Sequence, residues 1–212
     1  MTTKNILKNK GIMIVLSSPS GAGKTSICKK ILKINNNIKM SVSVTTRKQR
    51  NSELEGKDYY FYTQKKFLEE QKKEMFLESA KVFGNYYGTP KKFVEKNLIS
   101  GNDVIFDIDW QGAQKLSDYS KKDIVSFFIL PPTRKELKER LKKRNEDSSE
   151  IVKKRMSKAK SEISHWIEYD YVLINKNLDK CVNEILEIIK IEKKKRFRQN
   201  FLFDFIDDLL NS

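Results

Sequence analysis

The feature that most constrains this chain is a glycine-rich segment, residues 18–25 with the sequence SPSGAGKT, which follows a short apolar run. The apolar run covers Ile12–Leu16, and a helix-like stretch follows at 26–34. Gly21 and Gly23 would let backbone N–H groups close on phosphate oxygens without a Cβ in the way. The helix N-terminus adds partial positive charge. This strand–loop–helix order predicts a phosphate-binding loop of the Walker A type.

Two side chains of this loop would carry the chemistry. Lys24 can reach the β and γ phosphates as a point charge, and the Thr25 hydroxyl can ligate Mg²⁺. The chain departs from the Walker A pattern at Ser18, which stands in place of the first glycine. The anion-facing part of the loop stays intact if Ser18 can adopt the required backbone angles. A chance match in a surface turn is the alternative, which the placement between strand and helix disfavours. The expected ATP-binding residues of the loop are Ser20, Gly21, Ala22, Gly23, Lys24, Thr25 and Ser26.

Short apolar runs recur along the chain, with helix-patterned stretches between most of them. After the first, they cover Val104–Ile108, Ile124–Leu130 and Tyr171–Ile174. This alternation indicates an α/β fold with a parallel sheet covered by helices. With 212 residues the chain is long enough for one sizeable core but short for two independent domains. We expect a single domain, 1–212, with its core formed by residues 10–40, 98–132 and 170–195.

Three segments interrupt or follow this alternation. Residues 41–97 open with a stretch rich in Tyr, Phe and Thr that includes one helical part near Gln64–Lys73, which predicts a β-rich inserted lobe. Residues 133–169 are polar, arginine-bearing and almost wholly helical, and are a candidate mobile lid. A helix is expected over Leu178–Lys195, followed by a helical tail, 196–212. The spacing of Phe and Leu in Phe201–Leu210 predicts an amphipathic helix that packs on the body or on another subunit.

Charge and cysteine content narrow the class of partner. Forty-three Lys and Arg against 28 Asp and Glu give a net charge of +15, which attracts nucleotides, nucleic acid or acidic membrane. Much of the excess lies in helical stretches such as Lys135–Lys143, where solvated helix faces are the simpler interpretation. Cys28 and Cys181 lie far apart and support neither a disulfide framework nor a zinc site. No apolar stretch is long enough to span a membrane. We expect a cytoplasmic protein without nucleic-acid or membrane partners, and leave monomer and homo-oligomer open.

The run VIFDID at 104–109 predicts a buried strand that ends in two carboxylates on one face. An acidic residue at the C-terminal end of a parallel strand lies in the crevice where nucleotides bind in open α/β sheets. Asp107 is therefore a candidate to hold hydrated Mg²⁺ together with Thr25. The alternatives are a strand-end cap and a structural ion pair, and the pairing with the phosphate loop favours the metal.

Several further blocks follow one another in a distinctive order. These are SVSVTTRKQRNSE at 41–53, GKDY at 56–59, Glu78, GNYYGT at 84–89 and DIDWQG at 107–112. The ordered set resembles the guanylate kinases over nearly the whole chain. The resemblance implies a P-loop NTPase with a parallel-sheet core, an inserted GMP-binding lobe at 41–97 and a helical lid at 133–169. It also implies transfer of the γ-phosphate of ATP to GMP, with Mg²⁺, giving ADP and GDP.

The same resemblance assigns roles position by position. Guanine would be read by Glu78 and Asp109, and Asn175 would lie near the adenine end of the donor site. Fork-shaped guanidinium groups and phenols suit an acceptor phosphate independently of the resemblance. The rest of the implied GMP site is Ser43, Arg47, Arg50, Glu53, Tyr59, Tyr87 and Thr89. The implied catalytic set is Lys24, Arg47 and the lid arginines Arg140, Arg144 and Arg155.

Three other interpretations stay open at this point. A guanylate-kinase-like domain that binds protein partners without catalysis would have lost the phosphate loop, which is intact here. A nucleic-acid-binding protein would fit the net charge. A related small-molecule kinase with another acceptor would share the loop and differ in the acceptor site.

Overall fold

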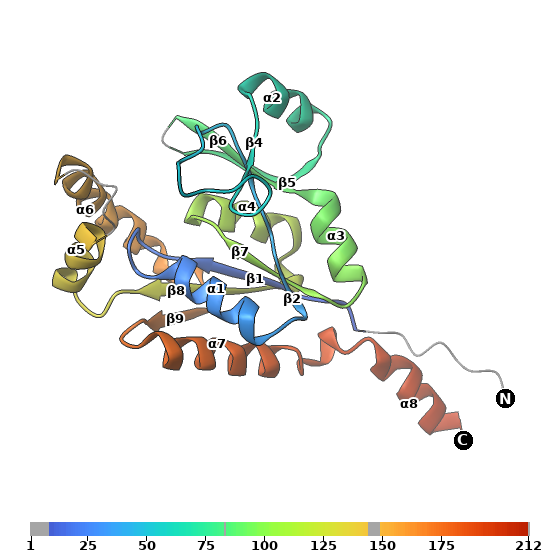
Figure 1. The fold of residues 1–212 in the computed structure, drawn as a ribbon. Helices are drawn as coiled ribbons and strands as arrows, with labels where there is room; N and C mark the ends of the chain where they lie inside the picture. The colour runs from blue at the N-terminus through green and yellow to red at the C-terminus, as the bar shows by residue number, and fades with distance from the viewer. Residues whose placement is uncertain (1–8, 83, 144–148, 212) are drawn as a thin grey trace.

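The core of the molecule is a five-stranded sheet with the order β2-β7-β1-β8-β9. The computed structural model describes residues 9–82, 84–143 and 149–211, and omits the side chains of 143 and 149–154. Every pairing in this sheet is parallel, with Met13 opposite both Val104 and Ile124. The parallel α/β core expected from the alternating pattern is confirmed (Figure 1). The strands are β1 (Met13–Ser17), β2 (Ile38–Met40), β7 (Asp103–Asp107), β8 (Ile124–Leu130) and β9 (Tyr171–Ile174).

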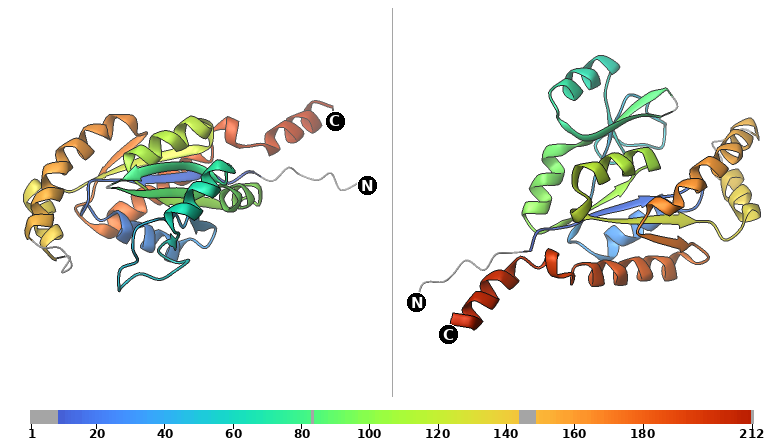
Figure 2. Two further views of the ribbon diagram at one scale, coloured as in Figure 1. Left: turned by 90° about the horizontal axis from the view of Figure 1, so that it is seen from above. Right: turned by 180° about the vertical axis from the view of Figure 1, so that it is seen from behind.

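Helices cover both faces of this sheet (Figures 1 and 2). Successive side chains of the central strand β1 point to opposite faces, so each face has its own apolar cluster. Ile14 and Leu16 pack with α1 (Lys24–Ile34) and α7 (Leu178–Glu192). Met13 and Val15 pack with α3 (Lys91–Ile99) and α4 (Trp110–Ser120). Because β1 is fully buried, the phosphate loop that follows it is held on rigid structure. A one-turn 3₁₀ helix, η1 (Lys121–Asp123), joins α4 to β8.

A second sheet, with the order β4-β3-β6-β5, rises above the first (Figure 1). Its strands are β3 (Val44–Thr45), β4 (Tyr60–Phe61), β5 (Phe76–Val82) and β6 (Asn85–Pro90), and α2 (Gln64–Lys72) lies beside it. The Phe67 ring of α2 stacks on Phe76 and Tyr86. A Cβ at Gly88 would lie 3.0 Å from the Phe76 ring, so a larger residue at this position would displace that ring. The inserted segment is thus β-rich, as its composition predicted.

A helical segment follows β8. It contains α5 (Arg134–Lys143), α6 (Ser149–Ser164) and the 3₁₀ helix η2 (His165–Glu168). Leu137 and Leu141 of α5 form a small separate core with Ala159 of α6. Arg144, a predicted catalytic residue, lies outside the described residues.

The C-terminal end differs from expectation in two ways. The helix expected to reach Lys195 ends at Glu192, and a short 3₁₀ turn, η3 (Arg196–Arg198), follows. The amphipathic helix is present as α8 (Phe201–Asn211), but it extends away from the body (Figure 2). Among the described residues, α8 does not pack on the body, so that alternative is wrong, while packing on another subunit stays a prediction. Cys28 and Cys181 are both buried free thiols. In the described part of the chain, no helix is long and apolar enough to cross a membrane.

Candidate active site

The phosphate loop has the backbone shape that its glycines predict. Gly21 and Gly23 have φ of 93° and 102°, a region that side chains with a Cβ rarely adopt. A Cβ on Gly23 would also lie 2.5 Å from the Asn175 amide nitrogen. Ser18 does not have a positive φ, since Glu74 is the only such non-glycine residue among those described. The missing first glycine therefore introduces no backbone strain.

The Lys24 side chain is held at the centre of the loop by β7. Its Nζ lies 2.9 Å from Asp107 Oδ1 and donates to the Ile108 carbonyl at 2.6 Å. Burial by itself would lower the pKa of Lys24, but the charge of Asp107 outweighs it and the pKa is raised. Lys24 is therefore a fixed cation at neutral pH.

Thr25 and Asp107 lie together beside this lysine. The Thr25 hydroxyl donates to Asp107 Oδ2 at 2.8 Å. A hydroxyl and a carboxylate are oxygen ligands of the kind that Mg²⁺ takes, together with phosphate oxygens and water. The donor set thus fits a hydrated Mg²⁺ that is shared with a bound nucleotide.

The strand β7 ends earlier than its sequence pattern predicted. It stops at Asp107, and Asp109 is the N-cap of α4, accepting from the Gly112 amide at 3.0 Å. The expectation of two carboxylates on one strand face is therefore wrong. Asp109 is placed by a helix cap because an acidic side chain satisfies the exposed amides there. Both carboxylates still line the same cleft.

A cluster of arginines and tyrosines lies across the cleft from the phosphate loop. Arg47 pairs with Glu53 at 2.7 Å, and its guanidinium carbon lies 5.4 Å from the centre of the Tyr59 ring. Burial by itself would lower the pKa of Arg47, but the hydrogen bond and charge of Glu53 outweigh this effect and the pKa is raised. The Tyr59 and Tyr87 rings meet edge to face at 6.0 Å. Glu53 does not line the cleft, and instead orients the arginine that does.

Glu78 lies deeper in the cleft, on β5. Its side chain is buried, with 7% of the residue exposed, and Oε1 accepts from the Thr89 hydroxyl at 2.7 Å. Burial raises the pKa of Glu78 to about 7, against the lowering effect of the Thr89 hydrogen bond. Glu78 is therefore a buried carboxyl group and does not face solvent. Thr89 lies behind Glu78, so it positions this carboxylate.

The helical segment contacts the phosphate loop from the opposite side. Arg140 donates to the carbonyls of Ala22 and Asn175 at 3.1 and 3.0 Å, and pairs with Glu136 at 3.0 Å. The Asn175 amide donates to the same Ala22 carbonyl at 2.9 Å, so Asn175 braces the loop and does not line the cleft. Arg155 Nη1 donates to the Ser20 hydroxyl at 3.3 Å.

Glu162 is a cleft residue that the sequence did not indicate. Its Oε2 accepts from the Ser20 backbone N–H at 3.1 Å. A carboxylate thus sits on an amide of the loop that is shaped for phosphate. Nothing in the sequence distinguishes Glu162 from other charged residues of a polar helix. Lys158, one helical turn earlier, also lines the cleft.

These groups line one continuous cleft of about 780 Å³. Ala22, Glu53, Thr89 and Asn175 are the described site candidates that do not line it. The candidates that it brings together are Ser20, Gly21, Gly23, Lys24, Thr25, Ser26, Ser43, Arg47, Arg50, Tyr59, Glu78, Tyr87, Asp107, Asp109, Arg140 and Arg155.

A phosphate loop after the first strand of a parallel sheet, with a polar cleft at the carboxyl ends of the strands, defines a P-loop phosphotransferase. The chain belongs to the guanylate kinase family, whose model matches residues 10–192. It is 50% identical over 203 residues to a guanylate kinase of Paramagnetospirillum magneticum, covering 96% of this chain and 95% of that protein. A guanylate kinase of Agrobacterium fabrum is 47% identical over 204 residues, covering 96% and 93%.

A solved structure gives the same result for the fold. The crystal structure of guanylate kinase from Anaplasma phagocytophilum matches with a TM-score of 0.80 and 38% identity. The match covers 96% of this chain and 97% of that one. The likeness therefore includes the inserted sheet and the helical segment as well as the core.

Proposed function

We propose that this chain transfers the γ-phosphoryl group of ATP to GMP, giving ADP and GDP. The observation that carries the proposal is the single cleft that joins the phosphate loop to the arginine–tyrosine cluster and Glu78. Phosphoryl transfer needs little acid–base chemistry from the protein and depends on positioning and charge neutralisation. A cleft that holds both nucleotides in line provides this.

The donor end would be formed by the phosphate loop. Its backbone amides bind phosphate oxygens, and Lys24 faces the bond that breaks. Thr25 and Asp107 are the groups that would hold Mg²⁺, which when bound neutralises charge on the β and γ phosphates. Arg155 and Arg140 lie at the loop from the lid side and would complete the positive surroundings of the transferred group.

The acceptor end would bind GMP by charge and by shape. Arg47 and Arg50 supply guanidinium groups for the acceptor phosphate, with Tyr59 and Tyr87 as phenol partners. Guanine presents N1–H and an N2 amino group side by side, and an ionised carboxylate can only accept hydrogen bonds. In its ionised form Glu78 would therefore accept hydrogen bonds from guanine, whereas adenine presents an acceptor at N1 and no donor at position 2.

Asp109 would accept a second hydrogen bond from guanine. Its Oδ1 accepts from the Gly112 amide in the helix cap, and the residue lines the cleft. The two carboxylates come from different elements, β5 and the start of α4, and would hold the base plane between them. The buried thiols Cys28 and Cys181 fit a reducing compartment, and we place the enzyme in the cytoplasm.

The test is an acceptor screen with the purified chain, ATP and Mg²⁺, in which GDP and ADP are quantified by chromatography. We expect kcat/KM for GMP to exceed that for AMP by at least ~100-fold, because buried carboxylates reject a base that lacks the two donors. Lys24→Ala is the matched control for contaminating kinases. If none of the nucleoside monophosphates is phosphorylated, a non-catalytic binding domain is favoured. Equal use of several bases would favour a kinase with another acceptor.

A further inference from the structure

Glu78, the buried carboxyl group of the proposed guanine site, borders two cavities. It lines the nucleotide cleft, and it also lines a second hollow of about 470 Å³ that residues of β5, α3 and α4 enclose. Lys115 of α4 lines this second hollow and not the cleft. A side chain in the second hollow can therefore act on Glu78 without occupying the space that a nucleotide needs.

Helix α4 brings Lys115 close to Glu78. A Cβ on Gly112 would lie 3.4 Å from Glu78 Oε2, so the first turn of α4 packs directly on this carboxyl group. Residues three apart share one face of a helix, so Lys115 lies on the same side of α4 as Gly112. The Lys115 ammonium group donates to the backbone carbonyl of Ser79, which directly follows Glu78 on β5. One lysine thus joins α4 to the strand that carries the carboxylate.

The charge of Lys115 opposes the effect of its acidic neighbours on Glu78. Burial is the main reason that the pKa of Glu78 is raised to about 7; the charge of Asp109 adds to this rise, and the charge of Lys115 opposes it. Only the ionised carboxylate is restricted to accepting hydrogen bonds, which is the form that suits the two donors of guanine. The charged and titratable groups around Glu78 on this side are Asp109, Lys115, Asp118 and Tyr119 of α4, Glu74 of the turn after α2, and Lys91 of α3.

We propose that Lys115 is a positioning residue of the guanine-binding site, which joins α4 to β5 and places a positive charge beside Glu78 from the second hollow. The proposal rests on the proposed function, because it concerns the carboxylate that would bind guanine. Lys115 does not line the cleft, so it acts on the base through Glu78. Its loss should weaken the use of GMP most at the pH values where Glu78 is partly protonated.

The test is the pH profile of kcat/KM for GMP, measured for the native chain and for Lys115→Gln. We expect the variant to be about 2- to 3-fold less efficient near pH 6, the effect of one water-screened charge, and to approach the native value near pH 8.5. Ionisation of the GMP phosphate is common to all variants and cancels in the ratio. An equal loss at every pH would indicate a merely structural contact and would overturn the proposal, as would an unchanged profile.

Two further variants separate the charge of Lys115 from its surroundings. Lys115→Arg keeps the positive charge and should keep the native profile. Lys91→Gln, which removes another lysine of the second hollow, is the matched control and should leave the profile unchanged. An equal change in Lys91→Gln, or a Lys115→Arg profile like that of Lys115→Gln, would contradict the assignment.

A measurement without nucleotide distinguishes this proposal from the proposed function. Carboxyl-carbon NMR follows the ionisation of Glu78 directly, and its signal is identified by its absence from Glu78→Gln. The pKa of Glu78 should be higher in Lys115→Gln than in the native chain, because a favourable charge is lost. An unchanged pKa would overturn the role of Lys115 even if the native chain phosphorylates GMP. A native chain that does not phosphorylate GMP, with the pKa still raised in the variant, would instead overturn the proposed function and with it any role in binding guanine.

Discussion

Replacing Glu78 by Gln should change the pH dependence of stability in a defined direction. The substitution keeps the shape and the oxygen that accepts from Thr89, but removes the ionisable group. Burial raises the pKa of Glu78 from 4.5 to about 7. In the unfolded chain the carboxyl returns to its ordinary value, so the two states bind different numbers of protons between these pH values.

The sign and size of the change in stability with pH follow from this difference in bound protons. Below about pH 4.5 the carboxyl is protonated in both states and contributes nothing. As the pH rises, the unfolded chain ionises first, so the folded state loses stability until the pH passes about 7. Because one pKa unit corresponds to about 1.36 kcal/mol, the full change in the pKa of Glu78 corresponds to about 3 kcal/mol. As the pH rises from acidic to mildly alkaline, the free energy of unfolding of Glu78→Gln should therefore increase by about 2–3 kcal/mol relative to that of the native chain.

The assay is urea denaturation of both proteins at several pH values, without nucleotide. Glu69→Gln, on the exposed side of α2, is the control and should follow the native profile. Parallel profiles for the native chain and Glu78→Gln would refute the reasoning, because they would mean that the Glu78 carboxyl ionises equally in both states. The same variant should lose GMP efficiency, since the amide nitrogen opposes the donors of guanine.

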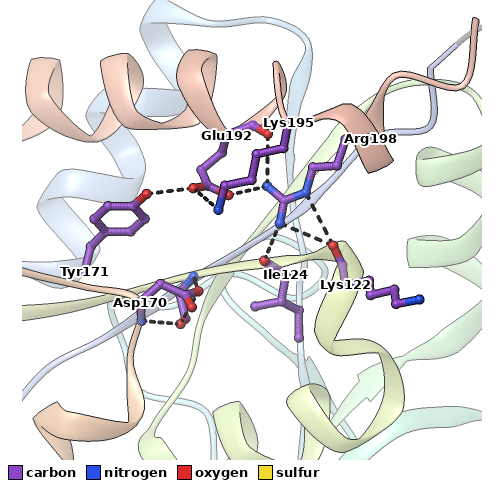
Figure 3. Close-up of polar contacts among 8 residues, drawn as sticks. Lys122, Ile124, Asp170, Tyr171, Glu192, Lys195 and Arg198 are labelled. Carbon is purple, nitrogen blue, oxygen red and sulfur yellow. Dashed lines mark hydrogen bonds and ion pairs between the residues drawn. The ribbon is translucent and has the colours of Figure 1, made fainter. Parts of the chain in front are cut away.

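Three further outcomes are expected from single changes. Lys24→Ala should lower kcat at saturating ATP and Mg²⁺ by at least ~100-fold, measured in the chromatographic assay, and near-normal turnover would remove Lys24 from the mechanism. Glu162→Gln should lower the Kd of ATP, measured by calorimetry, about 3-fold or more, because an anionic side chain no longer competes with phosphate for the Ser20 amide. An unchanged or higher Kd would contradict this. Arg198→Met should lower the free energy of unfolding, measured with urea, by about 3 kcal/mol, because the buried Glu192 loses one of its two cationic partners (Figure 3). A loss below about 1 kcal/mol would show that the Arg198–Glu192 ion pair contributes little to stability.

Much of the fold could be predicted because its determinants are local in the sequence. The run Ile12–Leu16 and the loop after it define a strand and a helix start through apolar pattern and glycine spacing alone. The same applies to the runs that became β8 and β9. The inserted β-rich segment is marked by its aromatic residues, which stack around Phe67.

The errors arose where a helix cap or a tertiary contact decides the structure. Asp109 looked like a strand residue because it continues a period of two, but its carboxylate satisfies the amide of Gly112 and starts α4. Helix α7 ends at Glu192, and the next residue, Lys193, pairs with the buried Asp103 at 2.8 Å. Asp103 lies 90 residues before Lys193, so no local pattern indicates that contact, whereas the cap joins Asp109 to a residue only three positions later.

Glu162 shows why a site cannot be read completely from residue types. An acidic side chain is an unexpected neighbour for bound phosphate, and sequence reasoning passes over it for that reason. In the folded chain its carboxylate occupies the Ser20 amide, while Asp107 neutralises Lys24 at 2.9 Å. The donor end is thus held together by the protein's own anions. A phosphate that takes the Ser20 amide must displace Glu162, and because Glu162 and Arg155 share α6, the displacement acts directly on the helix that carries Arg155 to the loop. Phosphate binding and the position of this helix are therefore coupled through one hydrogen bond.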